Sequence, residues 1–574
     1  MNRAALSGRA YRLIRLAAAL LLTAVFWGCH EDRADGVVRI GLPEEPRTLN
    51  IWLASDTNSR KILSQIYQPL YLRDPKTLKL IPWLAAADPI YDAGEMSYTV
   101  RLRNARWSDG TRLTADDVIF TAWVINEFKV PRYAAKWAVI QRIETPDQHT
   151  VKFYLKKPVA IFHARTLTTP IVSRSEWQTL AENALTTAKP LRTLQNYEVT
   201  RPVGTGPFVL TEYRKGAYLH LEPNPYFFGT GQVIGGYLLG PYVKGIVFKL
   251  FGTADVAVLS LQKGGIDMFW ASIQPGYLPL LKQHRRIKVY HNQKSALYYM
   301  GFNLRKAPFD DSNLRRAIAT VIDKTFIVSR ILQGYGTPMP SFIPPANSFW
   351  FNPHVPQYGK DLPMARRVES AGRILADAGY TWDRPPSVAD GRPVPGQGLR
   401  LPDGAAMQKF TILTPPADYD PRRAFCGLMI QEWLRQLGMP AFARPMSFSS
   451  LLDQVKGQRD FDAFILGYGS LNLDPDYLRS FFSSKNDKPR GWNMSGYRNA
   501  RFDAVAAKSS EEMDREKRRE MVWEMQHMLI EDVPYIPLYN PDVLEAVNKE
   551  RFFGWVEMVE GIGNIWSFCT LKPL

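Results

Sequence analysis

Residues 98–128 constrain the fold of this chain more than any other stretch, because they specify a strand, a turn and a helix in succession. Residues 98–103 alternate apolar and polar side chains, the period-two pattern of a half-buried strand. Residues 108–110, Ser-Asp-Gly, favour a turn, since Asp bonds the backbone downstream of it and Gly accepts a positive φ. Thr114 then predicts the start of a helix of roughly three to four turns, with acidic residues in its first turn. One face of this helix is expected to be buried, through Val118, Ala122, Ile125 and Phe128.

Length and composition limit the protein class. A chain of 574 residues is too long for one hydrophobic core, so two or three domains are expected. A hydrophobic fraction of 45% with 12% aromatic residues excludes a largely disordered chain. The net charge is +17, but its basic residues are scattered among acidic ones, which indicates a solvated surface and no nucleic-acid partner.

The first 28 residues have the pattern of a secretory signal. Four arginines accompany an apolar run from Leu16 to Trp27, which is shorter than the about 20 residues of a spanning helix. Cys29 directly after Gly28 resembles a lipoprotein processing site, at which Cys29 would be acylated and would anchor the protein to a membrane. Ordinary cleavage a few residues later is the alternative, and both predict a periplasmic or otherwise extracytoplasmic protein.

The remaining chain alternates strands with helices, which predicts an α/β fold of lobes with mostly parallel sheets. Residues 296–304, ALYYMGFNL, form a nearly continuous apolar run, typical of a buried strand of the parallel type. Residues 533–540, VPYIPLYN, contain two prolines and predict an edge or crossing strand.

Six stretches carry a resemblance to one known family. The chain resembles the extracytoplasmic substrate-binding proteins of ABC importers, family 5, the dipeptide and oligopeptide type. The matching stretches, in family order, are IYQPLY at 66–71, IPWLAA at 81–86, LRNARWSDGTRLTADDV at 102–118, the segments at 201–229 and 300–324, and RILADAGY at 373–380.

The resemblance implies a periplasmic-binding-protein type II fold whose chain crosses between two lobes twice. An extra subdomain is inserted in the first lobe. The implied limits are a signal peptide at 1–28, a first lobe at 37–294 with the subdomain near 72–200, a second lobe at 295–530, and a return to the first lobe at 531–574.

No catalytic constellation is evident in the sequence. It contains no His-Glu-x-x-His zinc pair, no phosphate-binding Walker loop and no Gly-x-Ser-x-Gly elbow. Asp474 and Asp476 form the most suggestive carboxylate pair, and an Asp-Pro turn also explains them. Cys426 and Cys569 are read as two buried free thiols, with a disulfide between them as the alternative. We therefore expect no catalytic residue, metal ligand or cofactor.

The resemblance also implies where a ligand binds. One segment follows the first strand and maps to Ser55, Asp56 and Thr57. The other lies in the second lobe, within Gly467–Asp474. Its candidate ligand-binding residues are Tyr468, Gly469, Leu471, Asn472 and Asp474.

Three positions depart from the pattern of peptide-binding members. The acidic residue that receives a peptide amino terminus falls on Leu471, a preceding arginine on Ile465, and a ligand-stacking tryptophan near Ser449. A shift of one or two places would let Asn472 or Asp474 take the place of the acid. The solute is thus an oligopeptide by family default, with a sugar, an opine-like conjugate or a modified peptide left open.

The sequence therefore predicts a monomeric binding protein that captures a peptide or small solute between two lobes and delivers it to the transmembrane subunits of an ABC permease. An exported hydrolase and a ligand sensor built on the same fold are the alternatives.

Overall fold

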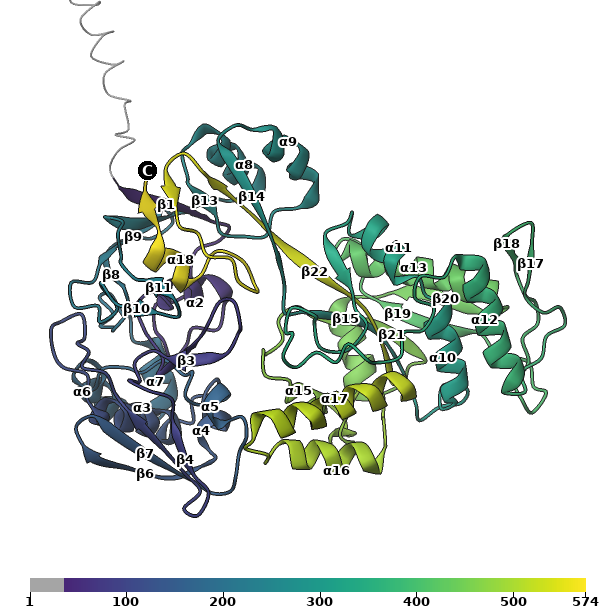
Figure 1. Cartoon of the computed structure of the whole chain (residues 1–574), viewed down its shortest axis with the longest axis horizontal. Coiled ribbons are helices and arrows are strands. Elements are labelled where there is room, and N and C mark those ends of the chain that lie inside the picture. The colour runs from purple at the N-terminus through teal and green to yellow at the C-terminus, as the bar shows by residue number, and fades with distance from the viewer. Residues whose placement is uncertain (1–35) are drawn as a thin grey trace, which may run out of the picture.

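The computed structural model describes residues 36–574, which form two α/β lobes joined side by side (Figure 1). The two-lobed fold expected from the sequence is confirmed. The expected signal peptide at 1–28 and Cys29 lie outside the described residues. The first lobe contains β1 (Val37–Leu42), α2 (Thr57–Leu63), β2 (Tyr71–Arg73), β3 (Leu80–Pro82), β8 (Phe208–Arg214), β9 (Tyr218–Pro223), β12 (Gly245–Leu250), α8 (Ala254–Lys263), β13 (Met268–Phe269), α9 (Leu278–Gln283), β14 (Ile287–Gln293) and α18 (Ile565–Thr570).

A separate four-stranded sheet lies at the end of this lobe. Its strands run antiparallel in the order β4-β5-β7-β6. Helix α3 packs against β6 and β7 of this sheet, and α6 packs against α3 (Figure 1). The elements are β4 (Ile90–Asp92), β5 (Ser97–Arg101), α3 (Ala115–Glu127), α4 (Ala134–Trp137), β6 (Ile140–Asp147), β7 (Thr150–Leu155), α5 (Phe162–Arg165), α6 (Arg174–Leu185) and α7 (Pro190–Asn196).

The strand, turn and helix expected in residues 98–128 are confirmed as β5, a turn at Gly110 and α3. Gly110 has a φ of +88°, which an L side chain rarely adopts. The Asp117 carboxylate accepts a hydrogen bond from the Thr114 backbone amide at 2.9 Å, which fixes the start of α3. The expected apolar face is buried, through Val118, Ala122, Ile125 and Phe128.

The second lobe packs helices on both faces of its sheet. Parallel pairs join β19 to β20 and to β21, as they join β1 to β12 and to β13 in the first lobe. The elements are β15 (Leu297–Phe302), α10 (Ser312–Val321), α11 (Lys324–Phe326), β16 (Gly336–Pro338), α12 (Met364–Asp377), β17 (Ser387–Ala389), β18 (Arg392–Val394), β19 (Phe410–Thr414), α13 (Pro421–Gln436), β20 (Ala441–Pro445), α14 (Phe448–Leu452), β21 (Ala463–Tyr468), α15 (Tyr477–Phe482), α16 (Ala500–Ser509) and α17 (Arg515–Asp532).

Strand β15 corrects one expectation. It is buried on both faces, as its apolar run predicts, with Tyr299 in one core cluster and Met300 in another. It is not parallel, because both of its neighbours, β21 and β22, run antiparallel to it. Helices cover both faces of this sheet, so a strand within it is apolar on both sides whether its neighbours run parallel or antiparallel to it. The apolar run therefore predicts burial and does not predict strand direction.

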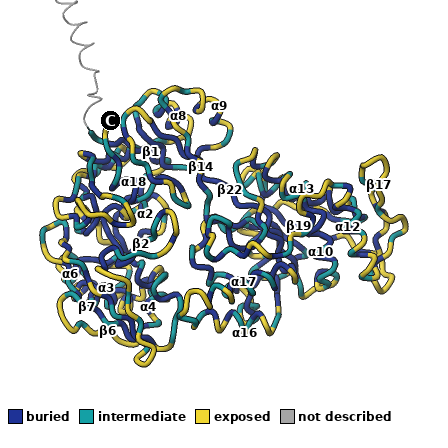
Figure 2. The backbone as a smooth tube through the Cα atoms, viewed as in Figure 1, coloured by how far each residue is buried: buried dark blue, intermediate teal, exposed yellow. Residues whose placement is uncertain are grey.

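One long strand, β22 (Tyr535–Asn548), belongs to both lobes. Its first half pairs with β15 and β16, and its second half pairs with β14 and β13. All of its residues are buried, and Figure 2 shows it passing from one lobe to the other. The crossing strand expected from the prolines at 533–540 is therefore confirmed. The chain also crosses in the opposite direction between β14 and β15.

The two described cysteines do not pair. Cys426 lies in α13 of the second lobe and Cys569 in α18 of the first, and both thiols are free and buried. Burial raises the pKa of both thiols, because it disfavours the thiolate. The prediction of two buried free thiols is confirmed.

Candidate ligand-binding cleft

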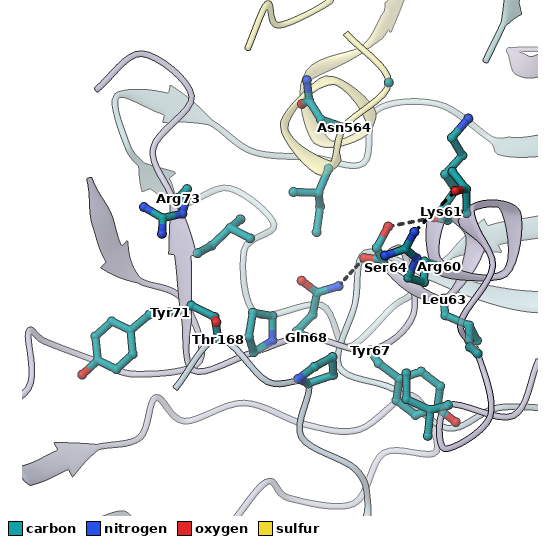
Figure 3. A pocket seen from close by; sticks show the side chains of 18 of the residues that line it. Arg60, Lys61, Leu63, Ser64, Tyr67, Gln68, Tyr71, Arg73, Thr168 and Asn564 are labelled. Atoms are coloured by element: carbon teal, nitrogen blue, oxygen red, sulfur yellow. Dashed lines mark hydrogen bonds between the residues drawn. The ribbon is translucent and has the colours of Figure 1, made fainter. Parts of the chain in front are cut away.

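A cavity of about 600 Å³ lies where the two lobes face each other. The first lobe supplies α2, β2, α18 and the loops that carry Arg132 and Trp270, and the second lobe supplies Asn472. Figure 3 shows Arg60 and Lys61 on one side of the cavity and Arg73 on the other. The cavity has the size of a typical small-molecule site, and both lobes contribute to its wall.

Helix α2 presents one face to the cavity. Thr57, Arg60, Lys61 and Ser64 all line it, at the i, i+3, i+4 and i+7 spacing of one helix face. The start of the helix is fixed by Asp56, whose side chain accepts a hydrogen bond from the Ser59 backbone amide at 2.8 Å. Asp56 therefore fixes where α2 begins, and its carboxylate does not line the cavity.

Four cationic side chains line the cavity, and no aspartate or glutamate does. Their recorded hydrogen bonds to backbone go to carbonyl oxygens: Arg73 to Leu78 at 2.8 Å, Arg60 to Asp56 at 3.2 Å, Arg132 to Ala54, and Lys61 to Trp270. Among the described residues none of the four has a carboxylate within 4.0 Å, the limit for an ion pair. The cationic groups are thus oriented but not neutralised.

Lys61 faces a buried carboxyl group on the crossing strand. Burial lowers the pKa of Lys61 to about 8, and the charge of Glu545 opposes that change. Burial also raises the pKa of Glu545 to about 7, although the Ile562 backbone amide donates a hydrogen bond to its carboxylate at 2.5 Å. Glu545 therefore neutralises Lys61 only in part near neutral pH.

Aromatic rings complete the wall. The ammonium group of Lys61 lies 4.8 Å from the centre of a Trp270 ring. Trp566 also lines the cavity, and its indole donates a hydrogen bond to the Arg73 backbone carbonyl at 3.0 Å. Gly563 is required beside Trp270, because a Cβ at that position would lie 1.9 Å from the indole nitrogen.

The structure brings two of the expected site residues together in this cavity. Thr57 from the first lobe and Asn472 from the second both line it. Ser55 is exposed beside α2 and Gly469 is exposed at the end of β21, and neither lines the cavity. Tyr468 stacks on Phe481 at 4.2 Å between ring centres and packs within the second lobe.

Leu471 and Asp474 hold the loop that carries Asn472. Leu471 is 7% exposed, packs in the core of the second lobe, and donates its backbone amide to the Ser295 carbonyl at 2.6 Å. Both carboxylate oxygens of Asp474 accept hydrogen bonds from Arg518, at 2.6 and 2.7 Å. The Asp474 carboxylate is therefore already neutralised within its own lobe.

The other two positions that depart from the peptide-binding pattern lie outside the cavity. Ile465 is fully buried in β21, and Ser449 is exposed on α14. Neither lines the cavity.

The sequence reasoning missed the cationic residues and both tryptophans of the cavity. The spacing of Arg60 and Lys61 after Thr57 is a helix-face pattern and could have shown that they share a wall. Arg73, Arg132, Trp270 and Trp566 come from separate segments, so no local signal connects them.

A smaller cavity of about 340 Å³ continues the cleft and shares Arg73 and Ala164 with the first. It reaches Asp474 and Arg515 of the second lobe. The lobes also touch directly, since the Ala160 amide donates to the Ser510 carbonyl at 3.0 Å. Within residues 36–574 no helix is long and apolar enough to cross a membrane, and no three His, Cys, Asp or Glu side chains cluster as metal ligands would.

Known proteins resemble this chain in both sequence and fold. The oligopeptide-binding protein AppA of Bacillus subtilis is 27% identical over 522 residues, covering 89% of this chain and 87% of that protein. Its structure in complex with a nonapeptide has a TM-score of 0.64 at 24% identity, covering 94% and 99% of the two chains. HbpA2 of Haemophilus parasuis matches with a TM-score of 0.76 at 22% identity, covering 94% and 100%.

A third structure shares the fold. The unliganded open form of the murein tripeptide-binding protein MppA has a TM-score of 0.74 at 19% identity, covering 94% of this chain and 97% of that one. The sequence profile of the bacterial extracellular solute-binding proteins, family 5, matches residues 79–489. With the two lobes, the crossing strand and the cavity between them, this match shows that the chain belongs to that family of solute-binding proteins.

Proposed function

We propose that this protein captures an oligopeptide or a similar small solute between its lobes and delivers it to the membrane subunits of an ABC permease. The main support for this proposal is the cavity, which is lined by α2 of the first lobe and by Asn472 of the second. A ligand in this position contacts both lobes and favours their closure. Micromolar capture requires only about 8 kcal/mol in total.

The resemblance to AppA supports a peptide-like ligand, because that relative is an oligopeptide-binding protein solved with a nonapeptide. The family and the named relatives are binding proteins, which favours binding over the hydrolase alternative.

We place the ligand contacts at Thr57 and Asn472, with Asp56, Leu471 and Asp474 holding these two residues in position. Ser55, Tyr468 and Gly469 border the same segments and are proposed to contact ligand only after the lobes close. We further propose lobe limits of 37–294, 295–530 and 531–574, with the subdomain near 72–200, and a monomer that is exported by residues 1–28 and anchored through an acylated Cys29.

Native mass spectrometry of freshly purified protein, combined with small-angle scattering, tests the function. A retained solute is expected as a discrete added mass, and stripping it is expected to raise the radius of gyration. Asn472→Ala is expected to weaken solute retention, whereas Ser470→Ala, two residues away and outside the cavity lining, serves as the matched control. Conversion of the solute by the pure protein, or a radius of gyration that no solute changes, would refute the proposal.

A further inference from the structure

The cavity has an unbalanced charge. Arg60, Lys61, Arg73 and Arg132 line it, without any aspartate or glutamate. A free peptide has an ammonium group as well as a carboxylate, and a buried ammonium group needs an acceptor of opposite charge. The lining supplies none.

Two of the arginines flank one turn and lie close enough to repel each other. Arg132 donates to the carbonyl of Ala54 and Arg60 to that of Asp56, so both sit against residues 54–56. The pKa of Arg60 is lowered, first by burial and then by the charge of Arg132. A guanidinium carries five N–H donors. The backbone bonds use one donor on each arginine, and Arg60 also donates from Nη2 to the Thr57 hydroxyl at 3.4 Å. The remaining donors suit a carboxylate or phosphate, which accepts them in pairs.

The acidic groups closest to the lining are engaged or set back from the cavity, and Asp88 and Glu512 line only the adjoining smaller cavity. Asp56 caps α2 through its bond to Ser59, and Glu545 lies behind Lys61 without lining the cavity. Asp474 of the second lobe is held by both terminal nitrogens of Arg518. No carboxylate in the lining is left to receive an ammonium group.

The second lobe offers a donor as well. The side-chain oxygen of Asn472 accepts the Asp474 backbone amide at 2.9 Å, and its NH₂ group offers two N–H donors to a ligand. Gln68 is already hydrogen-bonded within the first lobe. Its side-chain NH₂ group donates to the Ser64 carbonyl at 2.8 Å, and its side-chain oxygen accepts from the Trp83 indole at 2.8 Å. Arg60, Arg132, Arg73 and the NH₂ group of Asn472 thus supply free hydrogen-bond donors to the cavity.

We propose that the ligand is a small organic anion with at least two carboxylate or phosphate groups and no free ammonium group, bound by Arg60, Arg132, Arg73 and Lys61. An acidic peptide with a blocked amino terminus, or an acidic conjugate of an amino acid, has this chemistry. The inference rests on the proposed solute-binding function and narrows it to a charge class.

Isothermal titration with four probes of matched length tests the charge class. The probes are N-acetyl-Glu-Ala-Glu, the doubly phosphorylated N-acetyl-Ser-Ala-Ser amide, the zwitterion Ala-Ala-Ala and the cationic Lys-Ala-Lys amide. One or both anions are expected to bind at least about tenfold more tightly than Ala-Ala-Ala, which corresponds to about 1.4 kcal/mol. The cationic probe is expected not to bind. The tighter of the two anions identifies carboxylate or phosphate as the group recognised.

Variants distinguish anion binding at these arginines from general attraction of an anion to a cationic protein. Arg60→Gln and Arg132→Gln are each expected to weaken the better anion about tenfold or more, whereas Arg101→Gln, an exposed cation on the same lobe, is expected to leave it unchanged. Scattering with each probe distinguishes the two proposals. Closure with Ala-Ala-Ala or Lys-Ala-Lys amide as the tightest ligand overturns the anion proposal and leaves solute capture standing. Absence of closure with every probe and with any retained solute overturns both.

Discussion

Replacing Asp474 tests whether this carboxylate holds the cleft loop or binds the ligand. Asp474 and Arg518 form a bidentate pair at 2.6 and 2.7 Å, with side chains 8% and 5% exposed. Asp474→Asn removes the negative charge and one of the two acceptor oxygens, so the buried Arg518 guanidinium loses its counter-charge while it keeps its bond to the Ser509 carbonyl at 3.1 Å. Removing one partner of such a pair costs about 3–5 kcal/mol, because the other charge remains buried and unpaired.

For a lobe of this size, about 3–5 kcal/mol lowers the melting temperature by about 6–20 °C. Thermal melting by circular dichroism measures the loss, and titration below the melting range is expected to give a Kd within about threefold of the parent protein. The double variant Asp474→Leu with Arg518→Met is expected to recover most of the stability, since neither charge is then left alone. Glu198→Gln, which breaks an exposed pair with Lys215, is the control and is expected to melt with the parent protein. A variant at Asp474 that melts normally but no longer binds ligand would refute the structural role.

Three further changes probe the cleft and its support. Burial raises the pKa of Glu545 to about 7 from its usual 4.5, so the folded state holds this proton more tightly than the unfolded state does. The free energy of unfolding therefore falls as the pH rises from 4.5 to about 7. Glu545→Gln is therefore expected to raise the free energy of unfolding at pH 8 by on the order of 3 kcal/mol and to leave it nearly unchanged at pH 4, as urea denaturation at both pH values will show; an equal effect at both would contradict the assigned cause. Gly563→Ala places a methyl group against Trp270 and is expected to cost about 1–3 kcal/mol and to shift tryptophan fluorescence; an unchanged spectrum and melting curve would contradict the close contact. Leu471→Ala is expected to cost about 2–5 kcal/mol by thermal melting while the folded fraction keeps its Kd, whereas a weakened Kd without a loss of stability would indicate direct ligand contact.

The sequence predicts those parts of the fold that local chemistry determines. The turn at Gly110 and the helix after Thr114 follow from residues within a few positions of one another, and both form as expected. The direction of β15 does not follow from its own residues. It depends on β21 and β22, whose residues lie more than 150 positions later in the chain, and an apolar run reads the same whichever way the neighbours run.

The same distinction applies to the site. Thr57 and Asn472 were predicted through the resemblance, because the family pattern records which distant segments meet in space. Leu471 and Asp474 were predicted from the same pattern, yet their partners, the second-lobe core and Arg518, decide what their side chains do. Arg132 could not be predicted as a cavity residue, since nothing near it in the chain indicates that it reaches the turn at Ala54.

The charge of the cavity and the loss of the peptide anchors have one physical explanation. In the second-lobe loop, Leu471 packs in the core and Asp474 is paired with Arg518, so this lobe contributes an amide at Asn472 and no negative charge to the larger cavity. The facing wall contributes Arg60 and its neighbouring cations, which repel one another more strongly as water is excluded. If the lobes close as proposed, these charges oppose closure of the empty cleft, whereas a bound anion would reverse the sign of that interaction. On the anion proposal, the groups that select the ligand also make closure depend on it.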